Sequence, residues 1–98
     1  MTLYQIMKFI EKFSKTVQRP SNGYCLLTSD RFVGHLKHDK ASVLSGFLSD
    51  KEHCWIEVWG DFDTILVDFT ADQFGYPPLI VGPVTEMFNK YHYQYEMR

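Results

Sequence analysis

Three side chains in this sequence could together break an amide bond: the thiol of Cys25, the imidazole of His53 and the carboxylate of Asp68. A thiolate attacks a carbonyl carbon readily, and an imidazole beside it can take the thiol proton and later pass it to the leaving group. A carboxylate that holds the imidazole fixes its tautomer and stabilises its charged form. These residues are far apart in the sequence, so the fold must bring them together.

The stretch 53–74 predicts a β-hairpin. Two runs rich in Val, Ile, Trp and Phe, residues 54–59 and 62–69, flank the dipeptide Gly60-Asp61. A Gly-Asp pair between two such runs is typical of a two-residue hairpin turn.

A turn centred between residues 60 and 61 places His53 directly opposite Asp68, and opposite residues point to the same face of a hairpin. The same register pairs Trp55 with Leu66, Glu57 with Thr64 and Trp59 with Phe62. A longer turn that shifts the pairing by two residues keeps the imidazole and the carboxylate on one face, whereas a shift by one separates them.

Cys25 is expected in the first turn of a helix. Pro20 and Gly23 mark a loop, Asn22 is a plausible N-cap, and the helix would run to about Lys37. Backbone N–H groups and the positive end of the helix dipole lower the pKa of a thiol at such a position. Cys25 also shares a helix face with apolar residues, so the alternative is that it is a small buried hydrophobic side chain.

The remaining segments predict an α+β fold. Apolar spacing indicates a helix over residues 3–17, with Thr2 and Gln5 in a capping box, and apolar runs indicate strands over 42–48 and 79–81. The Tyr-rich tail fits a helix from Thr85 but also alternates as a strand would. We expect the Cys25 helix to pack on an antiparallel sheet, with residues 1–98 forming a single domain.

Three stretches resemble the transglutaminase-like branch of the papain-like cysteine hydrolases. They are Gly23-Tyr24-Cys25-Leu26-Leu27-Thr28-Ser29, His53-Cys54-Trp55-Ile56-Glu57-Val58 and Asp68-Phe69-Thr70-Ala71-Asp72-Gln73-Phe74, and the last is similar to the tail of small bacterial and phage-borne members. Together they cover the middle of the chain.

This resemblance implies a small papain-like or transglutaminase-like core with a Cys25–His53–Asp68 catalytic triad. The implied function is a cysteine-dependent amide hydrolase or acyl transferase, whether peptidase, deamidase or transglutaminase, that acts on a protein or peptide amide without a cofactor. The backbone N–H of Cys25 is one candidate donor to an oxyanion, and Gln18 or Asn22 is the candidate side-chain donor.

The other residues of the hairpin are expected to play lesser parts. Trp55 would lie on the same face as His53 and wall the substrate site. Cys54 would point to the opposite face as a buried, unreactive thiol beside Ile56 and Val58. Glu57 would lie on the rim, and Asp72 would be a loop residue that caps a turn.

Composition argues against several classes of protein. The chain has 98 residues, 45% of them hydrophobic, and a net charge of −2, which describes a folded core and gives no electrostatic support for nucleic-acid binding. Two cysteines make no disulfide framework, and no metal-binding motif accompanies His35 and His38. With neither a signal peptide nor a membrane span in the sequence, we expect a cytoplasmic protein. We also expect a monomer.

A catalytically inactive protein on the same fold is the second hypothesis. The interval between Cys25 and His53 is short for the family, and the tail is aromatic. Both features are compatible with a phage-encoded inhibitor that binds a protein and does no chemistry.

Overall fold

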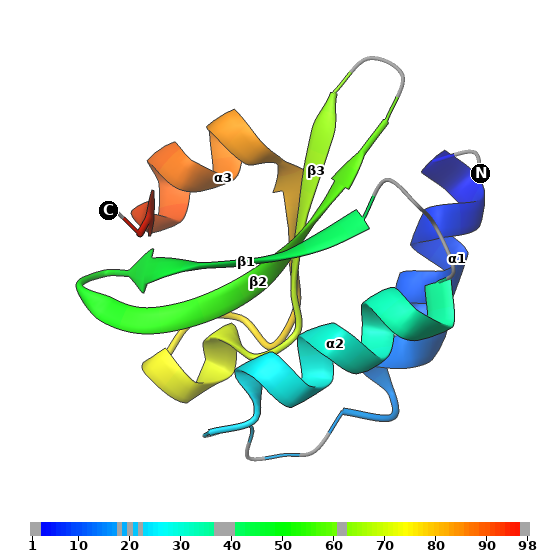
Figure 1. Ribbon diagram of the computed structural model, residues 1–98, viewed down its shortest axis with the longest axis horizontal. Coiled ribbons are helices and arrows are strands. Elements are labelled where there is room, and N and C mark those ends of the chain that lie inside the picture. Colours follow the sequence, from blue (N-terminus) through cyan, green and yellow to red (C-terminus); the bar gives the residue numbers. More distant parts are fainter. Residues whose placement is uncertain are drawn as a thin grey trace.

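The computed structural model describes residues 3–17, 19, 21, 23–36, 41–60 and 63–96. The elements along the chain are α1 (Leu3–Ser14), α2 (Cys25–Leu36), β1 (Ala41–Leu48), β2 (Lys51–Trp59), β3 (Thr64–Asp68), a 3-10 turn η1 (Ala71–Phe74), β4 (Ile80–Pro83), α3 (Val84–Tyr91) and β5 (Tyr93–Tyr95). The fold is α+β, as predicted: three helices pack on a curled antiparallel sheet (Figure 1).

The strands lie in the order β4-β3-β2-β1-β5, and each described neighbour pair is antiparallel. The helices α1 and α2 pack on one side of the sheet and α3 packs on the other (Figure 1). Because side chains alternate along a strand, β2 supplies apolar side chains to both sides.

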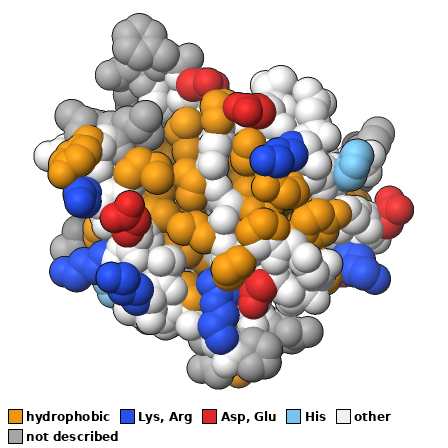
Figure 2. Space-filling view, turned by 180° about the vertical axis from the view of Figure 1, so that it is seen from behind, with side chains coloured by type: hydrophobic (Ala, Val, Ile, Leu, Met, Phe, Trp, Pro, Cys, Tyr) orange, Lys and Arg blue, Asp and Glu red, His pale blue; other side chains and the backbone are white. Residues whose placement is uncertain are grey.

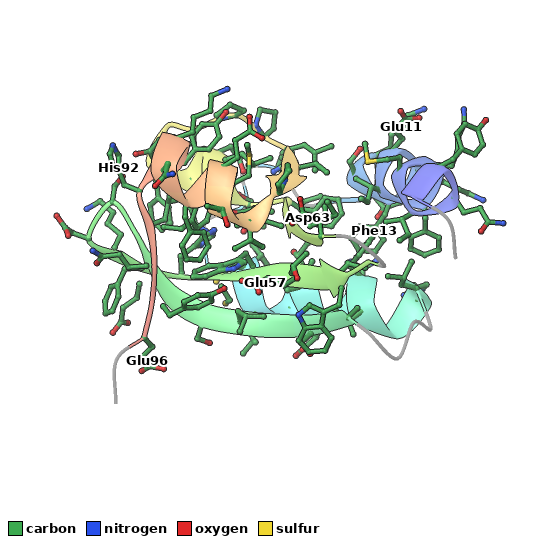
Figure 3. The ribbon with its side chains drawn as sticks, turned by 90° about the horizontal axis from the view of Figure 1, so that it is seen from above. Glu11, Phe13, Glu57, Asp63, His92 and Glu96 are labelled. Carbon is green, nitrogen blue, oxygen red and sulfur yellow. The ribbon has the colours of Figure 1, made fainter. Side chains whose placement is uncertain are left out.

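The first core lies between the sheet and the helices α1 and α2. Helical spacing along α1 and the turn after it buries one face, which consists of Ile6, Ile10, Phe13 and Val17. Phe13 points from α1 toward α2 and the sheet (Figure 3), and its ring centroid lies 5.0 Å from that of Phe69. The predicted helix over 3–17 ends at Ser14, where the hydroxyls of Ser14 and Thr16 donate to carbonyls of the last turn. Thr2, of the predicted capping box, lies outside the described residues.

The second core lies between the sheet and α3. It is built around Trp55, which is fully buried, and includes Leu48, Leu66, Met87 and Tyr93. These residues come from four strands and α3, so this core joins the C-terminal part of the chain to the central hairpins.

The β1–β2 hairpin turns through two residues, Ser49 and Asp50, whose φ angles are +48° and +69°. Two successive positive φ angles define the type I′ turn that suits the twist of a hairpin.

The β2–β3 hairpin has a longer connection than predicted. Trp59 pairs with Thr64 and Glu57 pairs with Leu66, so the predicted register, with its two-residue turn, is wrong by two positions. The N–H of Gly60 donates to the carbonyl of Asp63 at 2.8 Å, which closes the described part of this connection. A shift by two preserves the side-chain faces, and His53 and Asp68 therefore stay on the same side of the sheet.

The Tyr-rich tail combines both predicted conformations. The helix α3 ends at Tyr91, and His92 adopts a left-handed conformation with φ +63°. The chain then reverses into β5, which pairs with residues 46–48 of β1.

Hydrophobic side chains are not confined to the two cores. Phe9, Leu79 and Val81 are only partly buried at the edge of the first core. On the face opposite that of Figure 1, hydrophobic side chains gather at the centre and charged side chains stand around them (Figure 2). No helix in the described ranges has the length and apolar character needed to cross a membrane.

Candidate active site

Cys25 is the first residue of α2, as the sequence predicts. The N–H of Thr28 donates to the carbonyl of Tyr24 at 2.9 Å, so the helical hydrogen bonding begins directly before Cys25. Strand β3 pairs with β2 only over residues 56–59. The edge of β2 at residues 53 and 54 is therefore open, and the half-buried Cys25 thiol lies against it.

His53 and Asp68 form the expected contact across the hairpin. Nε2 of His53 lies 2.8 Å from Oδ2 of Asp68, and both side chains are almost completely excluded from solvent. The same carboxylate accepts the hydroxyl of Tyr93 at 2.6 Å and the N–H of Thr70 at 2.9 Å.

These contacts fix the tautomer of the imidazole. The Tyr93 hydroxyl and the Thr70 N–H donate to Asp68, so its carboxylate acts as an acceptor and Nε2 of His53 carries a hydrogen. Nδ1 is then the ring nitrogen that is left to exchange a proton.

The environment keeps the imidazole protonated at neutral pH. Burial alone would lower the pKa of His53, but the hydrogen bonds with Asp68 and Cys25 and the negative charges of both partners raise it to about 9. A buried imidazolium is stabilised here because the Asp68 carboxylate is in contact with the ring.

The thiol of Cys25 is correspondingly acidic. A hydrogen bond from the Cys54 thiol lowers its pKa most, and burial opposes that effect. The hydrogen bond with His53, the backbone N–H of Cys54 and the imidazolium charge lower it further, to about 4. Cys25 is therefore a thiolate paired with an imidazolium across the neutral range.

Cys54 is nearer to the site than its place on the strand suggested. It is buried, as predicted, but its Sγ lies 2.9 Å from Sγ of Cys25. Cys54 points to the face opposite that of His53, as predicted, but it touches the nucleophile because α2 brings Cys25 against that side of β2. The contact with Cys25, and then burial, raise the pKa of Cys54. The Cys54 thiol therefore stays protonated and donates a hydrogen bond to the Cys25 thiolate.

Gln73 is a site residue that the sequence analysis missed. Its Nε2 lies 3.3 Å from Nδ1 of His53, and its Oε1 accepts the N–H of Gly23 at 3.4 Å. Because an amide N–H can only donate, this contact forms when Nδ1 of the neutral ring accepts, and in that state the side chain joins the loop before α2 to the imidazole. Gln73 stands in the stretch that follows Asp68, and that proximity was the one available signal.

A tether holds the loop before α2 against the segment after β3. Arg19 donates to Asp72 and to the Phe69 carbonyl, both at 2.7 Å, and to the Pro78 carbonyl at 2.9 Å. Ser21 donates to the same Asp72 oxygen at 2.5 Å. Asp72 therefore does more than cap a turn, because it anchors the approach to Cys25.

Two hairpin residues differ from their predicted roles. Trp55 is fully buried and its indole N–H donates to Glu57 at 3.1 Å, so it supports the site from the core and its ring is not available to a substrate. Glu57 is not a rim residue: it is buried on the side of the sheet that faces α3 (Figure 3) and also accepts the hydroxyl of Tyr95 at 2.7 Å. The two oxyanion candidates Gln18 and Asn22 lie outside the described residues.

A cleft of about 370 Å³ opens beside the two thiols. Its lining consists of Cys25, His53 and Cys54 together with residues 45–47 of β1, Glu52 and Glu96. A substrate in this cleft would lie against the Cys25 thiol and would meet the residues Glu52 and Glu96 nearby.

No group of three His, Cys, Asp or Glu side chains in the described part of the chain could hold a metal ion. Comparisons with protein-family models, curated proteins and solved structures found no match. The function of this protein must therefore be inferred from the geometry of the site itself.

Proposed function

We propose that this protein is a cysteine-dependent amide hydrolase or acyl transferase in which Cys25, His53 and Asp68 act as a catalytic triad. The observation that carries the proposal is the buried pair of His53 and Asp68, 2.8 Å apart, next to a Cys25 thiol whose pKa is lowered to about 4 in part by the charge of His53. The helix start, the two hairpin strands and their order along the chain support a small papain-like or transglutaminase-like core.

In the proposed reaction the Cys25 thiolate attacks the carbonyl carbon of the amide. His53 then gives its Nδ1 proton to the departing amine, and the acyl group remains on sulfur as a thioester. Water or a second amine attacks the thioester while His53 takes up a proton, which gives hydrolysis or acyl transfer. Asp68 keeps the ring oriented throughout.

The developing oxyanion needs hydrogen-bond donors near Cys25. The backbone N–H of Cys25 at the start of α2 is one, because the first N–H groups of a helix have no partner within it. The amide of Gln73 is a side-chain candidate, since it already lies beside His53. Each donor would stabilise the tetrahedral intermediate more than the planar substrate.

A polypeptide is the substrate that this surface favours. Phe47 lines the cleft and offers an apolar contact to a side chain beside the reactive amide. Tyr24, Leu26 and Leu27, which flank the nucleophile along the chain, are 40%, 56% and 57% exposed and add apolar surface on α2. The carboxylates of Glu52 and Glu96 in the cleft favour positive charge in the same substrate.

Acylation by p-nitrophenyl acetate tests the proposal. We expect a burst of nitrophenolate, one acetyl group on Cys25 by mass spectrometry, and faster turnover when a primary amine is added. His53→Ala should abolish the burst. His35→Ala is the matched control, because His35 is an exposed histidine whose Nδ1 bonds to the carbonyl of Arg31 in its own helix. Equal acylation of wild type and His53→Ala would contradict the triad and leave the protein-binding hypothesis.

A further inference from the structure

The two thiols stand close enough to form a bond with each other. Their sulfur atoms are 2.9 Å apart and both cysteines are free. A disulfide needs about 2.05 Å, so the sulfurs would have to approach by about 0.9 Å. The contact joins α2 to β2, and a rotation about a side-chain torsion of Cys25 at the helix terminus moves its sulfur without disturbing the sheet.

We propose that Cys25 and Cys54 form an oxidative modification site, in which a peroxide converts the pair into an intramolecular disulfide and so switches Cys25 off reversibly. The inference depends on the two thiols and on the cleft beside them. It does not require that the protein be a hydrolase.

The two cysteines have different parts in this reaction. Cys25 is half-buried beside the cleft of about 370 Å³, which has room for a small oxidant, and it is the ionised thiol of the pair. Cys54 is buried and protonated, so it does not react first. Oxidation follows thiolate character and access, and both properties select Cys25.

In the first step the Cys25 thiolate attacks one oxygen of the peroxide. The S–O bond forms, the O–O bond breaks, and the hydroxide that leaves takes a proton from the adjacent imidazolium of His53 and becomes water. Cys25 is now a sulfenic acid. Sulfur has given up two electrons and the peroxide has accepted them.

In the second step Cys54 attacks the sulfenic sulfur. The S–S bond forms and the S–O bond breaks, and hydroxide leaves with the proton of Cys54 as a second water. The contact with Cys25 is the main cause of the high pKa of Cys54, so the loss of the Cys25 charge in the first step makes Cys54 easier to deprotonate. Overall, two thiols and one peroxide give one disulfide and two waters.

The disulfide would protect as well as inhibit. A sulfenic acid without a neighbouring thiol proceeds to sulfinic acid, which ordinary thiols do not reduce. With Cys54 in contact, the sulfenic acid is captured first, and a thiol reductant regenerates Cys25.

The test uses the dilute whole chain and hydrogen peroxide, followed by denaturation in N-ethylmaleimide. We expect wild type to lose two hydrogens and both maleimide sites, to give a peptide in which Cys25 is joined to Cys54, and to recover both thiols with dithiothreitol. Native labelling of Cys25 by iodoacetamide should fall at least about ten-fold on oxidation. Cys54→Ala should give a dimedone-reactive Cys25 that passes to sulfinic acid and is not restored.

Wild-type chain that carries sulfinic Cys25 beside a free Cys54, or that forms only disulfide-linked dimers, would overturn the inference. The wild-type peptide map decides this even if Cys54→Ala folds poorly. The readout is a cross-link, so it is separate from the acylation assay. A protein that forms the disulfide without being acylated would support this site and contradict the proposed hydrolase.

Discussion

Asp68 is the residue on which most of the polar contacts of the site converge. It accepts from His53, Tyr93 and Thr70, and its side chain is 1% exposed. Three hydrogen-bond donors hold this buried carboxylate in one position, where it accepts from the His53 ring. Its hydrogen bond and its negative charge both raise the pKa of His53, and Asp68 therefore acts on Cys25 through the imidazole.

Asp68→Asn should impair catalysis while sparing the fold. Loss of the charge lowers the pKa of His53, which in turn raises the pKa of Cys25 as the imidazolium is lost. The corresponding loss in a serine triad is about 10⁴-fold. Because a thiol is partly ionised without help, we expect a loss of at least roughly ten-fold in the rate of acylation of Cys25.

Tyr93→Phe is the matched control for that change. It removes the 2.6 Å hydrogen bond to the same carboxylate oxygen but leaves the charge in place. The acylation rate should fall much less than in Asp68→Asn. Equal losses in the two variants would mean that hydrogen bonding, and not charge, is what Asp68 supplies.

Cys54 should tune the acidity of Cys25 through its thiol proton. Cys54→Ala removes the donor that lowers the pKa of Cys25 most, whereas Cys54→Ser keeps a hydroxyl donor at the same place. We expect the pKa of Cys25 to rise in both variants, and to rise further in the alanine variant. Thiolate ultraviolet absorbance against pH measures this, and identical titrations would show that the thiol–thiol contact does not act on Cys25.

At the scale of the elements, the site is held by contacts between segments that are distant in the sequence. The loop before α2 is joined to the segment after β3 by Arg19, whose guanidinium reaches one side chain and two carbonyls. A flexible junction at this point would let the nucleophile move away from the imidazole.

Arg19→Ala should lower the free energy of unfolding by about 1–2 kcal/mol, because hydrogen bonds to two carbonyls and a carboxylate are lost together. Arg19→Lys should recover little of this, since one ammonium cannot replace the two-nitrogen fork. Urea denaturation measures both. Lys15→Ala is the control for removing an exposed positive charge, and an equal effect there would argue against the tether.

Gly46 lies where β5 and Trp55 approach β1. A Cβ on Gly46 would come 2.7 Å from the Trp55 ring and would also meet the carbonyl oxygen of Gln94. Gly46→Ala should therefore destabilise the fold by about 1–3 kcal/mol, as overpacking does.

Gly34→Ala is the matched control for Gly46→Ala. Gly34 lies in α2 with nothing within 4 Å of the added Cβ, so the change should stabilise the protein by about 0.5–1 kcal/mol through helix propensity. The two substitutions should thus shift the unfolding midpoint in opposite directions. Shifts of the same sign would contradict the account of how β5 packs.

The sequence was informative where the chemistry depends on local periodicity. The sequence correctly predicted that His53 and Asp68 share a face, although the predicted register was wrong by two residues. Side chains alternate between the two faces with a period of two, so a shift by two residues leaves each side chain on the same face. The position of Cys25 in the first turn of α2 was predicted from the Pro and Gly of the preceding loop.

Contacts that cross between elements could not be predicted. The approach of Cys25 to Cys54 depends on where α2 meets the open edge of β2. Glu57 was expected at the rim, but it is buried because the Trp55 indole and the Tyr95 hydroxyl donate hydrogen bonds to it. The sequence did not show that β5 brings Tyr95 back to the sheet. The contacts of Arg19 with Phe69 and of Gln73 with Gly23 could not be predicted either, since each joins residues that are 50 positions apart along the chain.

At the scale of the whole molecule, the site joins the two sides of the sheet. Cys25 and Cys54 belong to the side covered by α2, while His53 and Asp68 are held from the other side by Tyr93 of β5. Tyr93 also packs against Trp55 in the second core. Folding of both cores is therefore needed before the thiolate and the imidazolium can meet.

The rate of alkylation of Cys25 by iodoacetamide, measured from pH 5 to pH 9 with mass assignment of the adduct, tests the central claim most directly. Because the pKa of Cys25 is lowered to about 4 and that of His53 is raised to about 9, the thiolate should be fully formed over this range. We predict nearly equal rates at pH 6 and pH 8 in wild type. In His53→Ala, where the hydrogen bond from Cys54 remains, the rate should rise with pH around a higher thiol pKa than in wild type. A single rise centred at the ordinary thiol pKa of about 8.5, the same in both proteins, would contradict an ion pair between Cys25 and His53.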